Sequence, residues 1–431
     1  MGADRMPRVA LVNLGCRVNR VELDAMASKL EAMGCELAAQ EDADVVVVNT
    51  CAVTGEAEAK ARKAVRHAAA LPGVASVVAT GCVASLFADE LDALGGNVRV
   101  EVLKDQVPAA VVDALAEAGL APDPAAERPD GAGSVTPTGR MRPGIKVQDG
   151  CDNRCTYCIV WKARGPARSL PLAKAVEDVR RAVEAGAGEV VLTGINLGRY
   201  DGCAGGLTGL LSALLEQTDV GRVRLSSVEP GEVTEELLDL MAASSGRVAP
   251  FLHLPLQSGC DATLARMGRL YTVDEYRAVA QLAKERVPGV ALATDLIVGF
   301  PGETDEEFAE SLAFCRSVGY ANMHVFRYSK RPGTWAAGAP GQVPPHLSAE
   351  RSRTMRSMAA ESRRAFAAGL VGEPLLAFVE RPGRAVSGQL VEVLVDPDLP
   401  MGAFATVRPH GVLSDGRLDA RASLRTETPS A

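Results

Sequence analysis

Short runs of apolar residues alternate with helical stretches along most of this chain. Between residues 7 and 118 the runs RVALVNLG, DVVVVNT and ASVVAT are each followed by a helical pattern. Continuous apolar strands separated by helices are typical of a parallel sheet that is covered on both faces. We therefore expect a Rossmann-like α/β domain over residues 1–118, although GCRVNR, after its first strand, lacks the glycine fingerprint of a dinucleotide site.

The same alternation returns between residues 142 and 369. Six strand-like runs are separated by helical patterns such as LAKAVEDVRRAVEAG and DEEFAESLAFCRSVG; the runs are GIKVQ, EVVLTG, VRLSSV, FLHLPL, VALATDLIVGF and NMHVFRYS. Six βα units in series predict a barrel or a partial barrel, and an open doubly wound sheet is the alternative. A basic helical stretch, HLSAERSRTMRSMAAESRRAFAAG, closes this region.

Two further segments complete the division of the chain. Residues 119–141 are rich in Pro, Gly and Ala and carry no periodicity, which is typical of a linker. Within residues 370–431 the runs PLLAFVE, GQLVEVLVD and GAFATVRPHGV are short, β-like and divided by Pro, Gly and Asp, which predicts a small β-barrel. We expect three domains, at 1–118, 142–369 and 370–431.

Composition limits the classes of function. The 431 residues carry a net charge of −8, which argues against non-specific nucleic-acid binding by the whole chain but leaves room for local basic patches. No apolar run approaches the ~18 residues needed to cross a bilayer. The N-terminus enters a strand pattern without the apolar region of a signal peptide. We therefore expect a cytoplasmic protein that does not enter a membrane.

Ten cysteines in a cytoplasmic chain favour metal binding or catalysis, because disulfides are rare in a reducing compartment. Cys151, Cys155 and Cys158 follow the strand candidate GIKVQ in the loop CDNRCTYC. Three thiolates can hold three irons of a four-iron cluster and leave the fourth iron open to a substrate. A zinc site is the alternative, but structural zinc normally has four protein ligands, and the sequence places no fourth Cys or His nearby.

A second group of cysteines is scattered in sequence but shares one structural position. Cys16, Cys51 and Cys82 each lie just past the end of a predicted parallel strand of the N-terminal domain. The carboxyl ends of such strands converge on one crevice, so three thiolates are expected to meet there and to hold a second cluster. The alternative is three small buried residues, since free cysteine packs well. The remaining cysteines lack ligand spacing and are expected to be structural; they are Cys35, Cys203, Cys260 and Cys315.

The ordered motifs of the chain resemble one family. LGCRVN, NTCAVT, TGC and CDNRCTYC are followed by ARG, LTGINLG, LPLQSG, IVGFPGE and YSKRPGT. Together they closely resemble the methylthiotransferases of the radical S-adenosylmethionine (SAM) superfamily, over nearly the whole chain. The resemblance implies an N-terminal domain with its own four-iron cluster, a radical SAM partial barrel and a C-terminal β-barrel of the TRAM type.

The resemblance also implies cofactors and a mechanism. Two [4Fe-4S] clusters are expected, and SAM bound to the cluster of CDNRCTYC is cleaved to methionine and a 5′-deoxyadenosyl radical. The radical takes hydrogen from an inert aromatic carbon, sulfur from the second cluster attacks that carbon, and a second SAM supplies the methyl group. In a βα barrel the strand ends form the active rim, so four residues are expected to contact SAM; each has packing or a helix cap as its alternative role. These residues are Tyr157, Glu229, Gln257 and Asp295.

Finer features resemble one branch of the family. LGCRVNRVE, NTCAVTGEAEAKARKAVR and LTGINLGRY are most similar to the enzyme that acts on N6-threonylcarbamoyladenosine at tRNA position 37. The branches that act on isopentenyladenosine or on a ribosomal protein usually carry Met-Asn or Lys-Asn where this chain has Val18-Asn19. Two segments depart from the common pattern: IVWKARG has Trp161-Lys162 in place of Pro-Tyr, and GCVAS lacks a common Gln. Neither departure removes a cluster ligand.

Partners follow from this resemblance. We expect the anticodon stem-loop of tRNA as substrate, flavodoxin or ferredoxin as electron donor, and a monomer. Basic side chains near CDNRCTYC suit RNA phosphate or the SAM carboxylate, with a solvated surface as the alternative; they are Arg140, Arg142, Lys146, Arg154, Lys162, Arg164 and Arg168. Arg17, Arg20, Lys162 and Arg164 are candidates to meet the carboxylate of a threonylcarbamoyl group. A non-catalytic iron–sulfur carrier would leave the glycine-rich rim unexplained.

Overall fold

The computed structural model describes residues 5–124, 136 and 138–422. These residues form two compact units, and each is described by itself. The first comprises the described part of residues 1–171 together with 193–196 and 329–339; the second comprises 172–192, 197–328 and the described part of 340–431. The linker expected at 119–141 lies largely outside the described residues.

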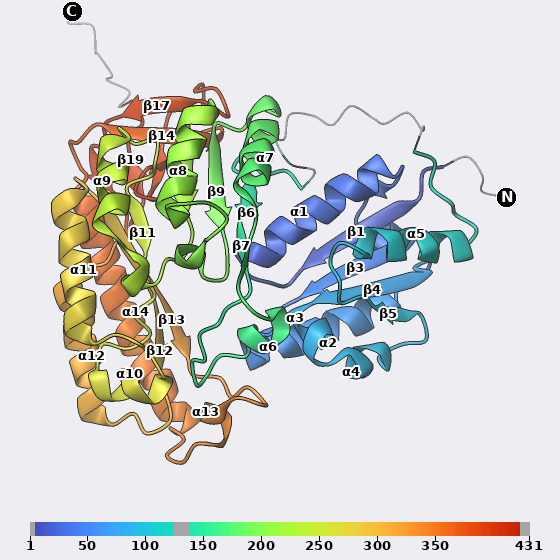
Figure 1. Ribbon diagram of the computed structural model, residues 1–431, viewed down its shortest axis with the longest axis horizontal. Helices are drawn as coiled ribbons and strands as arrows, with labels where there is room; N and C mark the ends of the chain where they lie inside the picture. Colours follow the sequence, from blue (N-terminus) through green and yellow to red (C-terminus); the bar gives the residue numbers. More distant parts are fainter. Residues whose placement is uncertain (1–4, 125–135, 137, 423–431) are drawn as a thin grey trace, which may run out of the picture. The chain divides into compact units, whose positions relative to one another are not determined.

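The first unit is built on a five-stranded parallel sheet (Figure 1). Its strands are β1 (Arg8–Asn13), β2 (Glu36–Leu37), β3 (Val45–Thr50), β4 (Ser76–Gly81) and β5 (Val98–Val100), in the order β2-β1-β3-β4-β5. All six residues of β3 and of β4 are buried. Strands buried on both faces appear in the sequence as continuous apolar runs, which is why this sheet can be predicted from the sequence.

Helices cover both faces of this sheet and make an α/β/α layering. The helices are α1 (Arg17–Ala32), α2 (Gly55–Ala69), α3 (Cys82–Leu86), α4 (Ala88–Asp92) and α5 (Val107–Glu117). Leu23 and Leu30 of α1 share one core with Val111 of α5, whereas Val65 of α2 and Leu91 of α4 belong to the core on the other face. The Rossmann-like domain expected from the sequence is confirmed.

The first unit continues through a compact segment that carries the CDNRCTYC loop. It contains β6 (Gly144–Lys146), β7 (Gln148–Asp149), α6 (Val160–Arg164) and β8 (Arg168–Ser169), and the later helix α13 (Trp335–Gly338). The run GIKVQ, which the sequence predicts as one strand, is two short ones. The second, β7, pairs antiparallel with β8, so the two ends of the segment that connects them lie side by side.

The second unit contains the other strands of the partial barrel. They are β9 (Glu189–Thr193), β10 (Arg222–Leu225), β11 (Phe251–His253), β12 (Ala291–Val298) and β13 (Asn322–Arg327). β9 pairs in parallel with β10, and β12 pairs in parallel with both β11 and β13. Parallel bridges at Val223–Val248 and Ser227–His253 connect the two groups. The parallel strand pairing expected for a partial barrel is therefore confirmed.

Helices follow the barrel strands as the periodicity predicts. They are α7 (Leu172–Glu184), α8 (Gly206–Gln217), α9 (Glu235–Ala243), α10 (Asp261–Met267), α11 (Val273–Arg286), α12 (Asp305–Val318) and α14 (Pro345–Ala368). Capping boxes at Thr272 with Glu275 and at Thr304 with Glu307 satisfy the first backbone N–H groups of α11 and α12. The local sequence therefore defines where these two helices begin.

The C-terminal segment forms a six-stranded mixed sheet, in the order β17-β14-β15-β16-β19-β18. Its strands are β14 (Leu375–Arg381), β15 (Arg384–Ser387), β16 (Glu392–Leu394), β17 (Phe404–Val407), β18 (Gly411–Val412) and β19 (Leu418–Asp419). Arg222 and Arg224 anchor it to the start of β10: their guanidinium groups donate to backbone carbonyls of this sheet and form ion pairs with the buried Glu189. This sheet therefore lies at the amino ends of β9 and β10 and leaves their carboxyl ends, where barrel chemistry occurs, uncovered by it.

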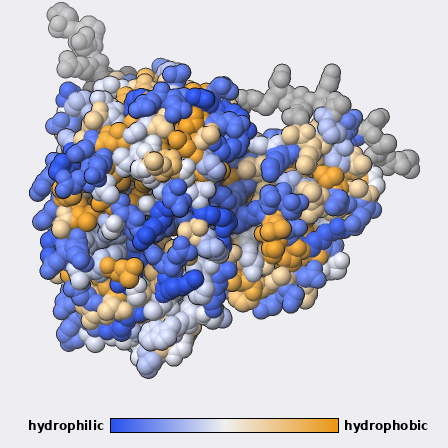
Figure 2. Space-filling model, in the orientation of Figure 1, coloured by the Kyte–Doolittle hydropathy of each residue, from blue (hydrophilic) through white to orange (hydrophobic). Residues whose placement is uncertain are grey.

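The surface carries no broad apolar area on the face in view. Figure 2 shows hydrophobic residues there in small groups between polar ones. Large apolar side chains that are exposed, such as Leu103, Leu270 and Trp335, are far apart in the sequence. Within the described part of the chain, no helix combines the length and the apolar character that a membrane crossing demands.

Candidate metal centres and SAM site

The three cysteines of the N-terminal sheet occupy one edge of it. Cys16 precedes α1 as its N-cap, Cys51 directly follows β3, and Cys82 opens α3 immediately after β4. The strands β1, β3 and β4 are neighbours, so their carboxyl ends carry these residues to the same place. Cys16 and Cys82 both lie close enough to influence the charge of Cys51. Burial raises the pKa of Cys51 to about 11.

A buried hydrogen-bond network centred on Asn19 and Thr50 joins the three strand ends. Asn19 accepts from the Cys16 thiol at 3.2 Å and donates to Asn49 Oδ1 at 2.9 Å and to the Thr50 carbonyl at 3.0 Å. The Thr50 hydroxyl donates to the Thr80 carbonyl and accepts from the backbone N–H of Val83 at 3.1 Å. These bonds fix the three cysteine-bearing loops relative to one another. Asn19 was noticed in the sequence only as part of the family motif.

Gly81 allows the loop that carries Cys82 to pack closely against the end of β3. Its φ is +92°, and a Cβ there would lie 2.3 Å from the Thr50 carbonyl oxygen and 2.5 Å from Asn49 Oδ1. We expect Gly81→Ala to destabilise the fold by about 2–4 kcal/mol, because backbone strain and a backbone clash add. Iron content should fall with it, since Cys82 follows directly.

The matched control for this substitution is Gly73→Ala. Gly73 also has positive φ, +88°, but no atom lies within 4 Å of its Cβ position. It should cost about 1–2 kcal/mol from conformation alone and leave iron content unchanged. Denaturant unfolding and iron analysis measure both. Equal effects of the two substitutions would show that the close approach at Gly81 is unimportant.

The first trio, Cys151, Cys155 and Cys158, lies in the loop between β7 and α6, and Cys16, Cys51 and Cys82 are the second trio. The backbone N–H of Cys158 donates to the Cys155 carbonyl at 3.1 Å, and the N–H of Val160 donates to the Cys158 sulfur at 3.4 Å. Cys151 and Cys155 both lie close enough to influence the charge of Cys158, and burial raises the pKa of Cys158 to about 12. The loop therefore brings its three cysteines near one another.

The sulfur spacing fits a cluster better than a single ion. Zinc held at about 2.3 Å by tetrahedral sulfurs would bring those sulfurs to roughly 3.8 Å from one another. Among the described residues, the three-residue set whose ligand atoms all lie within 4.8 Å is His253, Asp295 and His324; neither cysteine trio gathers its sulfurs so closely. A four-iron cluster is larger than one ion and needs wider spacing.

Gln148 fixes the start of the cysteine loop, and the sequence did not single it out. It is buried, and its amide donates to the carbonyls of Asp149 and Gly150. Its Oε1 accepts from the backbone N–H groups of Ile195 and Asn196 at 2.9 and 2.8 Å. It thereby holds the LTGINLG turn against the residues that precede Cys151. The only sequence signal is a polar residue inside an otherwise apolar strand run.

The segment 329–339, from the YSKRPGT motif, packs on the same unit as both cysteine trios. The Ser329 hydroxyl accepts from the backbone N–H of Gly55, and the buried Arg331 forms an ion pair with Glu58. Ala336 N–H donates to the Thr156 carbonyl at 3.0 Å. This segment therefore contacts both α2, which follows Cys51, and the loop that contains Cys155.

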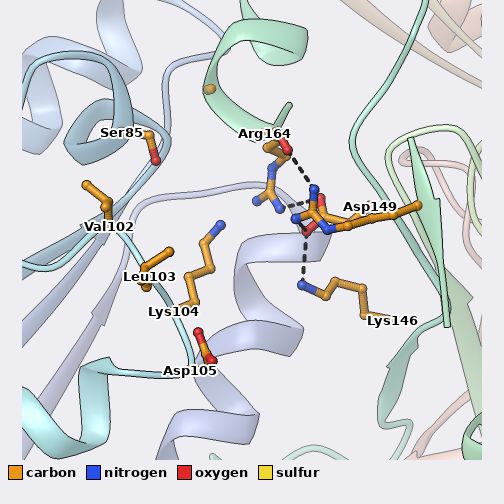
Figure 3. A pocket seen from close by; sticks show the side chains of 10 residues that line it. Ser85, Val102, Leu103, Lys104, Asp105, Lys146, Asp149 and Arg164 are labelled. Carbon is orange, nitrogen blue, oxygen red and sulfur yellow. Dashed lines mark hydrogen bonds and ion pairs between the residues drawn. The ribbon is translucent and has the colours of Figure 1, made fainter. Parts of the chain in front are cut away.

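A pocket of about 430 Å³, lined by charged and apolar residues, lies beside Arg164 in the first unit (Figure 3). Figure 3 shows Arg164, Asp149 and Lys146 grouped together, with the Lys104 side chain extending toward them from a neighbouring segment. Burial opposes ionisation of Asp149, but Arg164 and Lys146 outweigh it and hold the pKa of that carboxyl well below its usual range. The Arg164 side chain is 1% exposed, so it is not free to meet a substrate carboxylate, and our expectation for it is wrong.

Several basic residues around the cysteine loop form local contacts. Lys146 forms ion pairs with Glu22 and Asp149, and Arg168 pairs with Asp149 while remaining 58% exposed. Arg154 stacks over the Trp161 ring at 4.0 Å, and Lys162 donates to the Gly333 carbonyl at 2.7 Å. Arg154, Lys162 and Arg168 therefore hold local contacts while part of each side chain faces solvent.

The four residues predicted to bind SAM occupy loops and strand ends. Tyr157 is half-buried between Cys155 and Cys158 in the first unit. Glu229 follows β10 and forms an ion pair with Arg269; burial raises its pKa, and Arg269 opposes that effect. Gln257 has φ +69° and forms a parallel bridge with Leu296 of β12. The SAM roles of these residues stay predictions.

Asp295 lies on β12 between two histidines, His253 and His324. Arg363 donates to Asn322 Oδ1 at 2.8 Å, which turns the amide NH2 of Asn322 toward His324 Nε2 at 3.1 Å. His324 Nδ1 lies 3.0 Å from Asp295 Oδ1. Burial opposes ionisation of Asp295, but the two histidines hold its pKa well below the usual range.

The remaining cysteines are placed as the sequence predicts. Cys35 and Cys315 are buried, and Cys35 belongs to the core shared by α1 and α5. Cys203 contacts the carbonyl of Gly206, and Cys260 is buried at the N-cap of α10. No ligand group within 4.8 Å includes any of them among the described residues.

Comparison with known proteins agrees with this geometry. Residues 145–315 match the radical SAM superfamily, and residues 8–102 match a family described as "Uncharacterized protein family UPF0004". The chain is 34% identical to the threonylcarbamoyladenosine tRNA methylthiotransferase MtaB of Aquifex aeolicus, over 90% of this chain and 96% of that protein. This chain belongs to the radical SAM methylthiotransferase family. The methylthiotransferase is therefore an enzyme of a family that uses SAM and a [4Fe-4S] cluster.

Other relatives of the methylthiotransferase carry different names. It is 35% identical to the tRNA-2-methylthio-N(6)-dimethylallyladenosine synthase of Novosphingobium aromaticivorans, over 86% of each chain. It is 32% identical to the ribosomal protein uS12 methylthiotransferase RimO of Desulforudis audaxviator, over 98% of each. Among solved structures, the radical SAM methyltransferase TsrM from Kitasatospora setae has the same fold, with a TM-score of 0.55, 17% identity and coverage of 77% of this chain and 74% of that one.

Proposed function

We propose that this methylthiotransferase converts N6-threonylcarbamoyladenosine at position 37 of tRNA to its 2-methylthio derivative. The observation that carries the proposal is the sequence beside two ligand cysteines. VNRVE follows Cys16 as the first turns of α1, and AVTGEAEAK follows Cys51 and leads into α2. Both segments resemble the threonylcarbamoyladenosine branch, and both adjoin the centre from which sulfur would be delivered.

The relatives give this proposal partial support. The MtaB proteins of Aquifex aeolicus and Thermotoga maritima are 34% and 32% identical to this chain, over 90% and 97% of it. The relatives named for dimethylallyladenosine and for ribosomal protein uS12 are equally similar, so overall identity does not separate the three substrates. The residues next to the cysteines are therefore the better guide.

We further propose that the chain holds two [4Fe-4S] clusters, one on Cys151, Cys155 and Cys158 and one on the trio of the N-terminal sheet. When bound with SAM, these groups supply a radical that removes hydrogen from an inert aromatic carbon and the sulfur that replaces it. The protein positions the ligand cysteines. Gln148 fixes the start of the loop that carries Cys151, and Asn19 joins the strand ends that carry the trio of the N-terminal sheet. We expect the domain boundaries at 118, 142 and 370 to separate these functions.

Four residues are the proposed contacts of SAM. Asp295, kept ionised by its histidines, suits a hydroxyl or ammonium donor of SAM. Tyr157, Glu229 and Gln257 complete the proposed contacts. An anticodon stem-loop would meet the exposed parts of Arg154, Lys162 and Arg168. Flavodoxin or ferredoxin as electron donor, and a monomeric state, remain our predictions.

The substrate proposal makes a direct prediction. A threonylcarbamoyl group ends in a carboxylate, and an apolar pocket would reject it because burying an unpaired charge is costly. We expect at least about tenfold higher kcat/KM with tRNA that carries threonylcarbamoyladenosine than with tRNA that carries isopentenyladenosine, a difference of about 1.4 kcal/mol. Nucleoside mass spectrometry after reaction of the reconstituted enzyme measures the product.

Arg17→Ala, Arg20→Ala and Lys162→Ala test the source of that preference. At least one should raise the KM for the threonylcarbamoyl substrate, and Arg66→Ala, on the last turn of α2, is the control. Equal use of both tRNAs would remove the substrate proposal. Product on ribosomal protein uS12 instead of tRNA would assign this chain to the ribosomal branch.

A further inference from the structure

Arg164 is a buried arginine placed between the two cysteine trios. It is the last residue of α6, a five-residue helix that starts two residues after Cys158. The next residue, Gly165, accepts a backbone hydrogen bond from Cys151 at 3.1 Å. The backbone that carries Arg164 is therefore part of the loop that positions the first trio.

The side chain of Arg164 reaches the other trio. Its Nη2 donates to Asn19 Oδ1 at 3.1 Å, the same oxygen that accepts from the Cys16 thiol. Cys82 is buried and lies close enough to the guanidinium for the two groups to interact electrostatically. Burial opposes the charge of Arg164, but Cys82 and Glu22 outweigh it and raise the arginine pKa.

The surrounding carboxylates have other cationic partners besides this arginine. Glu22 forms ion pairs with Lys104 at 3.2 Å and Lys146 at 2.9 Å. Asp149 forms ion pairs with Lys146 at 3.1 Å and Arg168 at 2.8 Å. Arg164 contacts both carboxylates as well, at 2.9 and 3.0 Å. Four cations thus face two carboxylates, and the Arg164 side chain also contacts Asn19, the residue that accepts from the Cys16 thiol.

We propose that Arg164 is a positioning residue that supplies buried positive charge to a cluster held by Cys16, Cys51 and Cys82. This inference rests on the proposed function, which places a cluster there. A four-iron cluster on three thiolates is anionic, and its one-electron reduced form is more so. A fixed cation at a buried site stabilises the reduced form and raises the reduction potential. The charge balance of the second trio therefore depends on the loop that forms the first.

The test is a potentiometric titration of the reconstituted full chain, followed by electron paramagnetic resonance. The Cys151→Ala, Cys155→Ala, Cys158→Ala variant identifies the signal of the second cluster. In Arg164→Gln we expect the midpoint potential of that cluster to become more negative by at least about 59 mV. This shift corresponds to a tenfold weaker equilibrium for its one-electron reduction. The signal of the first cluster should move less.

Two further variants separate charge from folding. Glu22→Gln removes a negative charge and keeps an oxygen acceptor for Arg164, so it should shift the second cluster to more positive potential. Arg164→Lys keeps the charge and should restore most of the wild-type potential. Arg224→Gln is the matched control, because Arg224 is equally buried and paired with Glu189 in the other unit. It should lower stability without moving either potential.

The outcomes are distinguishable. Opposite shifts in Arg164→Gln and Glu22→Gln support the inference, and unfolding cannot produce them. If Arg164→Gln fails to assemble, the positive shift in Glu22→Gln still tests the charge effect. If Arg164→Gln and Glu22→Gln each hold two clusters with unchanged potentials, the proposed role of Arg164 is wrong and the proposed function still stands. A wild-type chain with iron for only one cluster would overturn the proposed function instead.

Discussion

Replacing Cys151, Cys155 and Cys158 together by alanine is expected to abolish reductive cleavage of SAM and to leave about half of the iron. The three cysteines lie near one another in a loop fixed by Gln148, and a cluster held by these three ligands would keep one iron open to SAM. Without these ligands no electron can enter the sulfonium. The second trio lies on different loops and should keep its iron.

Formation of 5′-deoxyadenosine in the presence of a strong reductant measures this expectation, together with iron and sulfide analysis. Cys35→Ala is the matched control, since Cys35 is buried in the same unit and contributes to a core but to neither trio. It should retain both iron and cleavage. Cleavage at the wild-type rate in the triple variant would refute the ligand assignment.

The triple variant of Cys16, Cys51 and Cys82 is expected to behave differently. It should still cleave SAM and lose the methylthio product, because the first trio holds its own cluster and needs no ligand from the sheet edge. The hydrogen-bond network through Asn19 and Thr50 remains in place, so the α/β/α layers should still fold. The expected effect is a complete loss of sulfur insertion with 5′-deoxyadenosine retained.

Mass spectrometry of the nucleosides and quantification of 5′-deoxyadenosine in one reaction measure both halves of this expectation. Iron should again fall to about half, this time with loss of the second spectroscopic signal. Methylthio product at a normal rate would show that sulfur is not delivered from this trio. Loss of SAM cleavage as well would show that the two centres are not independent.

The two cysteine groups were not equally visible in the sequence. Cys151, Cys155 and Cys158 are adjacent in one loop, so their spacing alone predicts a shared centre. Cys16, Cys51 and Cys82 are separated by more than thirty residues each, and only the rule that parallel strands end at one edge brings them together. That rule sufficed because β1, β3 and β4 are neighbours in the sheet.

Charge roles were the least predictable part. Arg164 and Lys162 are two residues apart in a basic segment, and the sequence predicts the same role for both. The structure buries Arg164 against Glu22 and Asp149 and leaves Lys162 half exposed, since the fold of the cysteine loop places the end of α6 beside α1. Side chains of one sequence type acquire different roles through contacts with residues more than a hundred positions away.

The sequence by itself determined the elements and the candidate cluster ligands. Continuous apolar runs, capping residues such as Thr304 and the cysteine spacing act over a few residues, so each can be recognised locally. Only the tertiary structure decided which polar groups support those ligands: Gln148 at the 194–196 turn, Asn19 at Thr50, and Arg164 at Cys82. These contacts join distant segments, and a buried polar group is stable only where its partners converge in space, which no local pattern encodes.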